Sequence, residues 1–184
     1  MAHITTAVEY GLHCLLFLVN PGAEAPLASA RELAELQGVP VEYVSKLFTK
    51  LQKAGLVIAA EGVRGGFRLA RPADSISVFD VIVAIDGEKA LFDCREIRSR
   101  CAVFAGKPAA WATRGVCGIH AIMLEAEARM REILSSNTLG DIAASVTAKA
   151  PPDFNQKIAK WLANRAPMRA PGPVRPAGGR DHRD

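Results

Sequence analysis

The stretch from residue 41 to residue 72 limits the possible folds most, and it reads VEYVSKLFTKLQKAGLVIAAEGVRGGFRLARP. Apolar residues recur at helical spacing over residues 40–54, which predicts a helix with one buried face. Two short apolar runs follow at 56–59 and 67–70, and the glycines between them allow a tight turn. The pattern predicts a helix followed by a two-stranded hairpin.

Positive charge recurs through the same stretch, and only Glu42 and Glu61 oppose it. Cations on the outer face of a helix and on a hairpin suit a DNA groove and its flanking phosphates. We expect Ser45 to reach a base edge and Arg64 to enter a minor groove. The predicted DNA-contacting residues are Tyr43, Ser45, Lys46, Lys50, Arg64, Arg68 and Arg71. For any one of them, a solvated side chain without a DNA contact is the alternative.

The flanking segments predict a helix-turn-helix. Ser29-x-x-Glu32 is a capping-box signature, and it indicates a short helix just before the longer one. Helical spacing also predicts a helix over residues 4–19 and a capped helix over 78–86. We therefore expect a mainly α protein whose residues 1–87 form a winged helix-turn-helix with a two-stranded wing.

The second half of the chain is organised differently. Residues 88–116 lack clear periodicity, and loops of this length are commonly functional or disordered. Residues 117–148 predict a long helix and a capping helix, with an apolar stripe that suits a dimer seam or packing within the chain. The stripe consists of Ile119, Ile122, Met123, Ala126, Met130, Ile133 and Leu134. Residues 149–184 form an extension that we expect to be largely disordered, with one amphipathic helix over 153–164.

Bulk composition permits a nucleic-acid partner without requiring one, because the net charge of +4 and the pI near 9.0 are mild. No run is long and apolar enough to cross a bilayer, and the N-terminus lacks the features of a secretory signal. We therefore expect a cytoplasmic protein without membrane association. Thiols stay reduced in the cytoplasm, so the four cysteines are expected to be ligands, sensors or core residues rather than disulfides.

Three runs, KLQKAGLV, GVRGGFRLARP and ISVFDVIVAIDG, resemble the signature of the Rrf2 family of winged-helix regulators. The resemblance covers about residues 4–148. It implies a homodimer with a long C-terminal dimerisation helix that binds palindromic promoter DNA. Many members of the family hold an iron–sulfur cluster in the loop before that helix, and the state of the cluster changes their DNA affinity. Other members lack a cluster.

Cys94, Cys101 and Cys117 occupy the corresponding segment, with gaps of six and fifteen residues. The segment VEYGLHC also resembles the RsrR-type members, in which a [2Fe–2S] cluster takes two cysteines from one subunit and a glutamate and a histidine from the other. That resemblance implies Glu9 and His13 as ligands. Cys117 matches the last family cysteine, and we pair it with Cys101 and keep Cys94 as a spare or alternative ligand.

Other roles are open for these residues. Glu9 and His13 lie four residues apart on one helix face, so an exposed surface pair is the alternative to a ligand role. His120, one turn after Cys117, is a lesser candidate ligand, and Cys14 is expected in the core.

Together these features predict a homodimeric DNA-binding transcriptional regulator that senses redox or iron–sulfur status through a cluster. The alternative is a winged-helix regulator without a cluster that responds to thiol oxidation or a small ligand. An enzyme is not expected, because the sequence has no zinc-protease, deaminase, phosphate-loop or nucleophile-elbow motif. A protein-interaction module without DNA is a third possibility, and steeply salt-dependent DNA binding would argue against it.

Overall fold

The computed structural model describes residues 4–19, 27–60 and 65–165. The predicted DNA contact Arg64 lies outside the described residues. Within the described ranges, no helix is both long and apolar enough to span a lipid bilayer.

Helices α2 (Ala30–Gln37) and α3 (Val41–Lys53) meet at a tight turn and form the predicted helix-turn-helix. Ser29 begins α2 with a capping box: its hydroxyl accepts from the Glu32 amide, and the Glu32 carboxylate accepts from the Ser29 amide. Gly38 ends α2 with a φ of 69°, a left-handed conformation that glycine adopts without the clash of a Cβ.

Strands β1 (Val57–Ala60) and β2 (Gly66–Leu69) pair antiparallel and form the predicted hairpin. The ring of Phe67 packs on that of Phe48 from α3, with 4.8 Å between the ring centroids. Phe48 is completely buried, and burial of such a side chain stabilises the fold by about 1.5–3 kcal/mol. The contact therefore fixes the hairpin beside α3.

Helices α1 (Thr6–Leu16) and α4 (Val78–Asp86) pack against each other, and both contact α3. The helix predicted over 4–19 is shorter at both ends, whereas α4 spans the predicted residues. Gly11 of α1 faces Ile85 of α4 so closely that an added Cβ would collide with its side chain. This close approach sets the position of α4 over the core.

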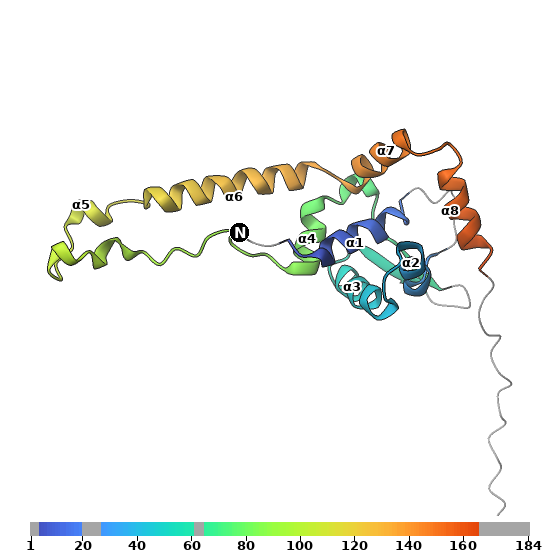
Figure 1. Cartoon of the computed structure of the whole chain (residues 1–184), viewed down its shortest axis with the longest axis horizontal. Helices are drawn as coiled ribbons and strands as arrows, with labels where there is room; N and C mark the ends of the chain where they lie inside the picture. The colour runs from blue at the N-terminus through green and yellow to red at the C-terminus, as the bar shows by residue number, and fades with distance from the viewer. Residues whose placement is uncertain (1–3, 20–26, 61–64, 166–184) are drawn as a thin grey trace, which may run out of the picture.

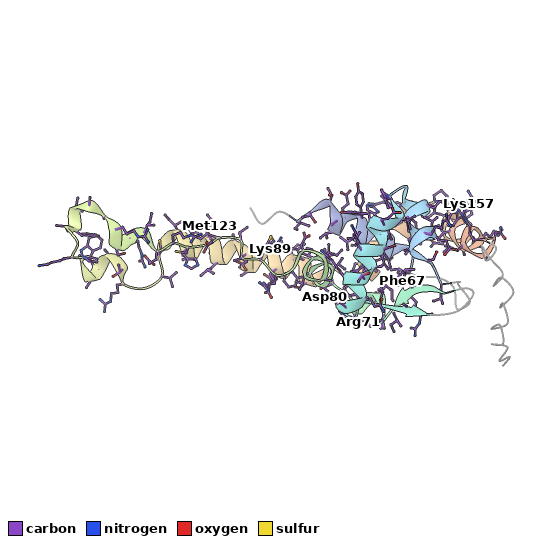
Figure 2. All side chains as sticks on the ribbon, turned by 90° about the horizontal axis from the view of Figure 1, so that it is seen from below. Phe67, Arg71, Asp80, Lys89, Met123 and Lys157 are labelled. Atoms are coloured by element: carbon purple, nitrogen blue, oxygen red, sulfur yellow. The ribbon has the colours of Figure 1, made fainter. Side chains whose placement is uncertain are left out.

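Residues 88–136, which we call the arm, leave the body after α4 and return to it as the long helix α6 (Gly118–Ser136). Figure 1 shows the arm projecting away from the other helices, and Figure 2, turned by 90°, shows it as a thin extension from below as well. Before α6 lie 3₁₀ turns at Ile97–Arg100 and Ala102–Phe104 and the one-turn helix α5 (Ala110–Thr113). The whole arm is described, and none of its residues is buried.

Two helices follow the arm: α7 (Leu139–Lys149) and α8 (Phe154–Ala163). Helix α8 confirms the amphipathic helix predicted in the extension. Leu162 of α8 is buried in the core, and Arg165 just after the helix forms an ion pair with Glu35 of α2. The first part of the extension is therefore attached to the helix-turn-helix.

Candidate functional site

The outer face of α3 carries an exposed stripe at spacings of four and three residues, opposite its buried face. The stripe consists of Glu42, Lys46, Thr49 and Lys53, and Ser45 lies beside it. The hydroxyls of Ser45 and Thr49 donate to the carbonyls of Val41 and Ser45, each at 2.9 Å, which leaves their oxygen lone pairs free to accept. The predicted contacts Ser45 and Lys46 are exposed here. Thr49 and Lys53 lie on the same stripe, at helical spacing from Lys46, and neither is among the predicted DNA contacts.

Two other predicted contacts on α3 have partners within the chain. The ring of Tyr43 packs edge-on against Tyr10 of α1, with 5.5 Å between centroids and an interplanar angle of 85°. The Nζ of Lys50 donates to the carbonyl oxygen of Ile85 at 2.6 Å, at the C-terminal end of α4. Lys50 thus joins α3 to α4 in the free protein, and a DNA contact from it would require this bond to open.

The hairpin contributes a smaller basic surface. Arg68 is exposed, and because neighbouring strand residues point to opposite faces, it lies on the side of β2 away from Phe67 and α3. Arg71, just after β2, pairs with Asp80 of α4 at 2.9 Å. The described residues therefore leave Lys46, Lys53 and Arg68 as the cations most open to DNA phosphates.

In the arm, Arg98 connects the outgoing and returning chain segments. Its guanidinium donates to both carboxylate oxygens of Glu96, at 2.6 and 2.8 Å, and to the carbonyl oxygen of Gly115 at 2.9 Å. The hydrogen bond to Glu96 raises the pKa of Arg98 above its ordinary value. Arg98 therefore joins Glu96 and Gly115, which lie two residues from Cys94 and Cys117 along the chain.

The third arm cysteine has a different setting. Cys94 and Cys117 are half-buried, and Cys117 is the N-cap residue of α6, whereas Cys101 is exposed between two turns. His120 lies one turn into α6, with its ring centroid 6.0 Å from that of Phe92. The pairing of Cys101 with Cys117 stays a prediction.

Glu9 and His13 are exposed on α1, at the rim of a mostly apolar groove of about 420 Å³. The groove is lined by α1, α4, α7 and Leu134 of α6. Figure 1 shows α1 in the body, away from the cysteine-bearing segment of the arm. In one chain, the described residues contain no group of three or more His, Cys, Asp or Glu side chains placed to hold a metal ion.

Helix α6 has two faces with different surroundings. The half-buried face packs against α4 and the outgoing segment, and it consists of His120, Met123, Glu127, Met130, Arg131 and Leu134. On the open face, Ile119, Ile122 and Ile133 are 64, 67 and 62% exposed. Ile119, Ile122 and Ala126 follow the three- and four-residue spacing of a coiled-coil seam, and Ile133 lies seven residues after Ala126, with Arg129 at the position between them. Exposed apolar stripes of this kind mark interaction sites. The predicted stripe is therefore divided between internal packing and a surface that one chain leaves open.

Comparison with known sequences gives a consistent family match. Residues 4–145 match the profile of the Rrf2 family, described as an iron-dependent transcriptional regulator. The protein rrf2 of Nitratidesulfovibrio vulgaris is 34% identical over 139 residues, which cover 76% of this chain and 85% of that protein. The HTH-type transcriptional regulator IscR of Vibrio vulnificus is 28% identical over 171 residues, which cover 91% of this chain and 95% of that protein.

Solved structures share the fold. The structure of CymR, the global cysteine regulator of B. subtilis, has a TM-score of 0.63 at 24% identity and covers 79% of this chain and 98% of that chain. The structure of T. potens IscR has a TM-score of 0.59 at 25% identity and covers 80% of this chain and 90% of that chain. The predicted mainly α, winged helix-turn-helix fold is confirmed.

Proposed function

Because the chain belongs to the Rrf2 family of transcriptional regulators, we propose that it is a homodimeric regulator that binds promoter DNA and senses redox or iron–sulfur status through a cluster on its arm. Membership of this family also confirms the expectation that the chain is not an enzyme. One observation supports the proposal: the bonds of Arg98 to Glu96 and Gly115 join the two segments that carry Cys94 and Cys117, and Cys117 begins a helix that leads directly back into the DNA-binding body.

In the proposed complex, the exposed stripe of α3 enters a major groove and the hairpin lies over the flanking backbone. Lys46 and Lys53 on α3, and Arg68 on the hairpin, supply positive charge for phosphates. The hydroxyl oxygens of Ser45 and Thr49 face outward and can accept from base edges. When cationic side chains neutralise DNA phosphates, counterions are released from the DNA. The affinity of the protein for DNA is therefore expected to fall steeply as the salt concentration rises.

The open isoleucine face of α6 supports the homodimer. Two copies of α6 pack through Ile119, Ile122 and Ile133, which removes these side chains from water. A two-fold axis through this seam presents two α3 helices to DNA at a fixed separation. The operator is then expected to be palindromic, with half-sites spaced to match.

The arm supplies donors of the chemistry that an iron–sulfur cluster needs. Its three thiols are those of Cys94, Cys101 and Cys117. Clusters take four protein ligands, mostly thiolates, so at least one further group must join them. We assign two places to thiols, Cys117 and Cys101 with Cys94 as the spare or alternative, and the other two to Glu9 and His13 of the partner subunit, with His120 of the same chain as a lesser candidate. A bound cluster, proposed as [2Fe–2S], would supply a one-electron redox couple.

Within the chain, Arg98 keeps the two half-buried thiols on facing segments of the arm, because it binds Glu96 on one segment and Gly115 on the other. A rearrangement of the arm alters the seam and hence the separation of the two α3 helices. Since the half-sites of a palindrome are fixed, the DNA affinity changes with it.

The test begins with anaerobic purification, iron and sulfide analysis, and an absorption spectrum between about 300 and 500 nm. A duplex selected from a random-sequence library is then titrated with oxidised, reduced and metal-free protein. The proposal requires a cluster signal and at least one state whose affinity differs from the others. Equal binding by all three states would reject the switch.

The second candidate is a cluster-free regulator that responds to thiol oxidation. It is favoured by the exposure of Cys101. Freshly purified protein without iron and without visible absorbance would support this candidate. In that case Cys101→Ser is expected to abolish any response to peroxide, while Cys14→Ser leaves the response in place.

A further inference from the structure

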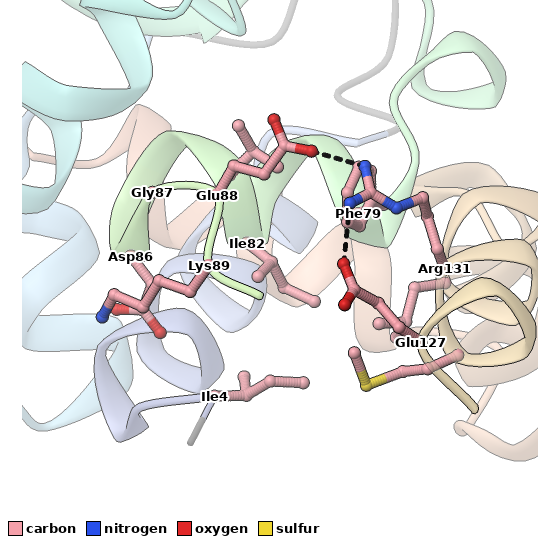
Figure 3. A pocket seen from close by; sticks show the side chains of 12 residues that line it. Ile4, Phe79, Ile82, Asp86, Gly87, Glu88, Lys89, Glu127 and Arg131 are labelled. Carbon is pink, nitrogen blue, oxygen red and sulfur yellow. Dashed lines mark hydrogen bonds and ion pairs between the residues drawn. The ribbon is translucent and has the colours of Figure 1, made fainter. Parts of the chain in front are cut away.

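At the base of the arm, the guanidinium of Arg131 on α6 holds three groups at once (Figure 3). It donates to Glu88 at 2.6 Å and to Glu127 at 3.3 Å, and it lies over the ring of Phe79 of α4, 4.8 Å from the ring centroid. These groups border a small cavity of about 40 Å³ between α4 and α6. Arg131 therefore links α6 both to α4 and to the segment that follows α4.

Glu127 extends this link to the start of the arm. Its second carboxylate oxygen accepts from the backbone amide of Leu91 at 3.1 Å. The outgoing segment is thus attached to α6 at Glu88 and again at Leu91. The side chain of Glu127 is only 20% exposed, so water screens this attachment less than it screens the ion pairs on the open surface of the arm.

The end of α4 that Arg131 holds also binds the DNA-reading helix. The carbonyl of Ile85 accepts from Nζ of Lys50 on α3 at 2.6 Å. The carboxylate of Asp86 accepts from the amide and hydroxyl of Thr5, at 2.8 and 2.7 Å, where α1 begins. Residues 85–88 are therefore a junction where α1, α3 and α6 meet.

We propose that Arg131 is a positioning residue that transmits a rearrangement of the arm to α3 through this junction. A shift of α6 moves Glu88 through its bond to Arg131, and with it the end of α4. The end of α4 then moves α3 through the bond between Ile85 and Lys50. A guanidinium suits this role because its planar fork binds two carboxylates while its face stacks on an aromatic ring, which a lysine ammonium cannot do. The inference rests on the proposed function, since it requires an arm that changes with the sensed state.

The main test compares wild type with Arg131→Met, Arg131→Lys and Glu127→Gln. Glu125→Gln is the matched control, because Glu125 lies two residues from Glu127 on the exposed side of α6. The readout is the ratio of dissociation constants for the library-selected duplex between cofactor-loaded and metal-free protein. We expect Arg131→Met to reduce this ratio by about two- to thirty-fold, with Arg131→Lys intermediate and Glu125→Gln at the wild-type value. A wild-type ratio in Arg131→Met would overturn the inference.

A second readout separates this inference from the proposed function. If wild type itself binds DNA equally in all states, the proposed switch fails. Amide hydrogen exchange on metal-free protein then still tests the junction. Exchange at Leu91 is expected to accelerate in Glu127→Gln, and exchange in the last turn of α3 is expected to accelerate in Arg131→Met. If α3 exchanges at its wild-type rate in Arg131→Met, Arg131 does not communicate with that helix.

Discussion

Replacing Ile122 by alanine is expected to weaken self-association of the chain by about 30- to 1,000-fold. Complete burial of an isoleucine side chain contributes about 1.5–3 kcal/mol, and Ile122 is 67% exposed in one chain, so about 1–2 kcal/mol is available at the seam. A two-fold axis repeats the loss in both subunits, which gives about 2–4 kcal/mol and the stated change in the dissociation constant.

Sedimentation equilibrium over a wide range of protein concentrations measures this change directly. Leu124→Ala is the matched control, because Leu124 is also an exposed apolar residue of α6, at 48% exposure, but lies off the isoleucine stripe. The control is expected to associate as wild type does. A monomeric wild type, or equal dissociation constants for Ile122→Ala and Leu124→Ala, would refute the assignment of the seam to this face.

Three further predictions concern stability. Burial raises the pKa of the Cys14 thiol from 9.0 to about 11; since the unfolded thiol ionises first, stability is fully present below about pH 9 and falls as pH rises toward 11. Urea unfolding at about pH 8 and about pH 10.5 should show this loss of unfolding free energy in wild type and not in Cys14→Ala. An equal change in unfolding free energy between the two pH values in both proteins would contradict the burial argument. Phe48→Ala removes a fully buried ring and should cost about 3–5 kcal/mol in urea unfolding, whereas a loss below about 1 kcal/mol would mean that the hairpin is held by other contacts. Ser77→Ala removes the hydroxyl that accepts from the Asp80 amide at 3.0 Å and should cost about 1 kcal/mol in thermal unfolding, and an unchanged midpoint would count against the capping box.

The short-range features of the fold were predictable from the sequence. Capping boxes at Ser29, Ser77 and Thr138 start α2, α4 and α7, and Gly38 and Gly87 follow the ends of α2 and α4. Each of these signals acts over three or four residues, so the order of amino acids alone determines it. The exposed positions of Ser45 and Lys46 follow in the same way from helical spacing.

The partners of the charged and thiol side chains were decided by the tertiary structure. Lys50 was expected to face DNA, yet its ammonium binds Ile85, 35 residues further along the chain. Arg131 binds Glu88 across 43 residues, and no local pattern indicated that contact. The pairing of Cys101 with Cys117 stays a prediction, whereas the bond from Arg98 to the Gly115 carbonyl, 17 residues further along the chain, comes from the tertiary structure alone.

The sequence by itself therefore determined which segments form the main helices, where the capped helices begin, and which of their faces are apolar. Only the tertiary structure decided which apolar face of α6 stays open and which cations are already bonded within the chain. The physical reason is that caps and spacings act between near neighbours, whereas these outcomes depend on how distant helices are placed against one another.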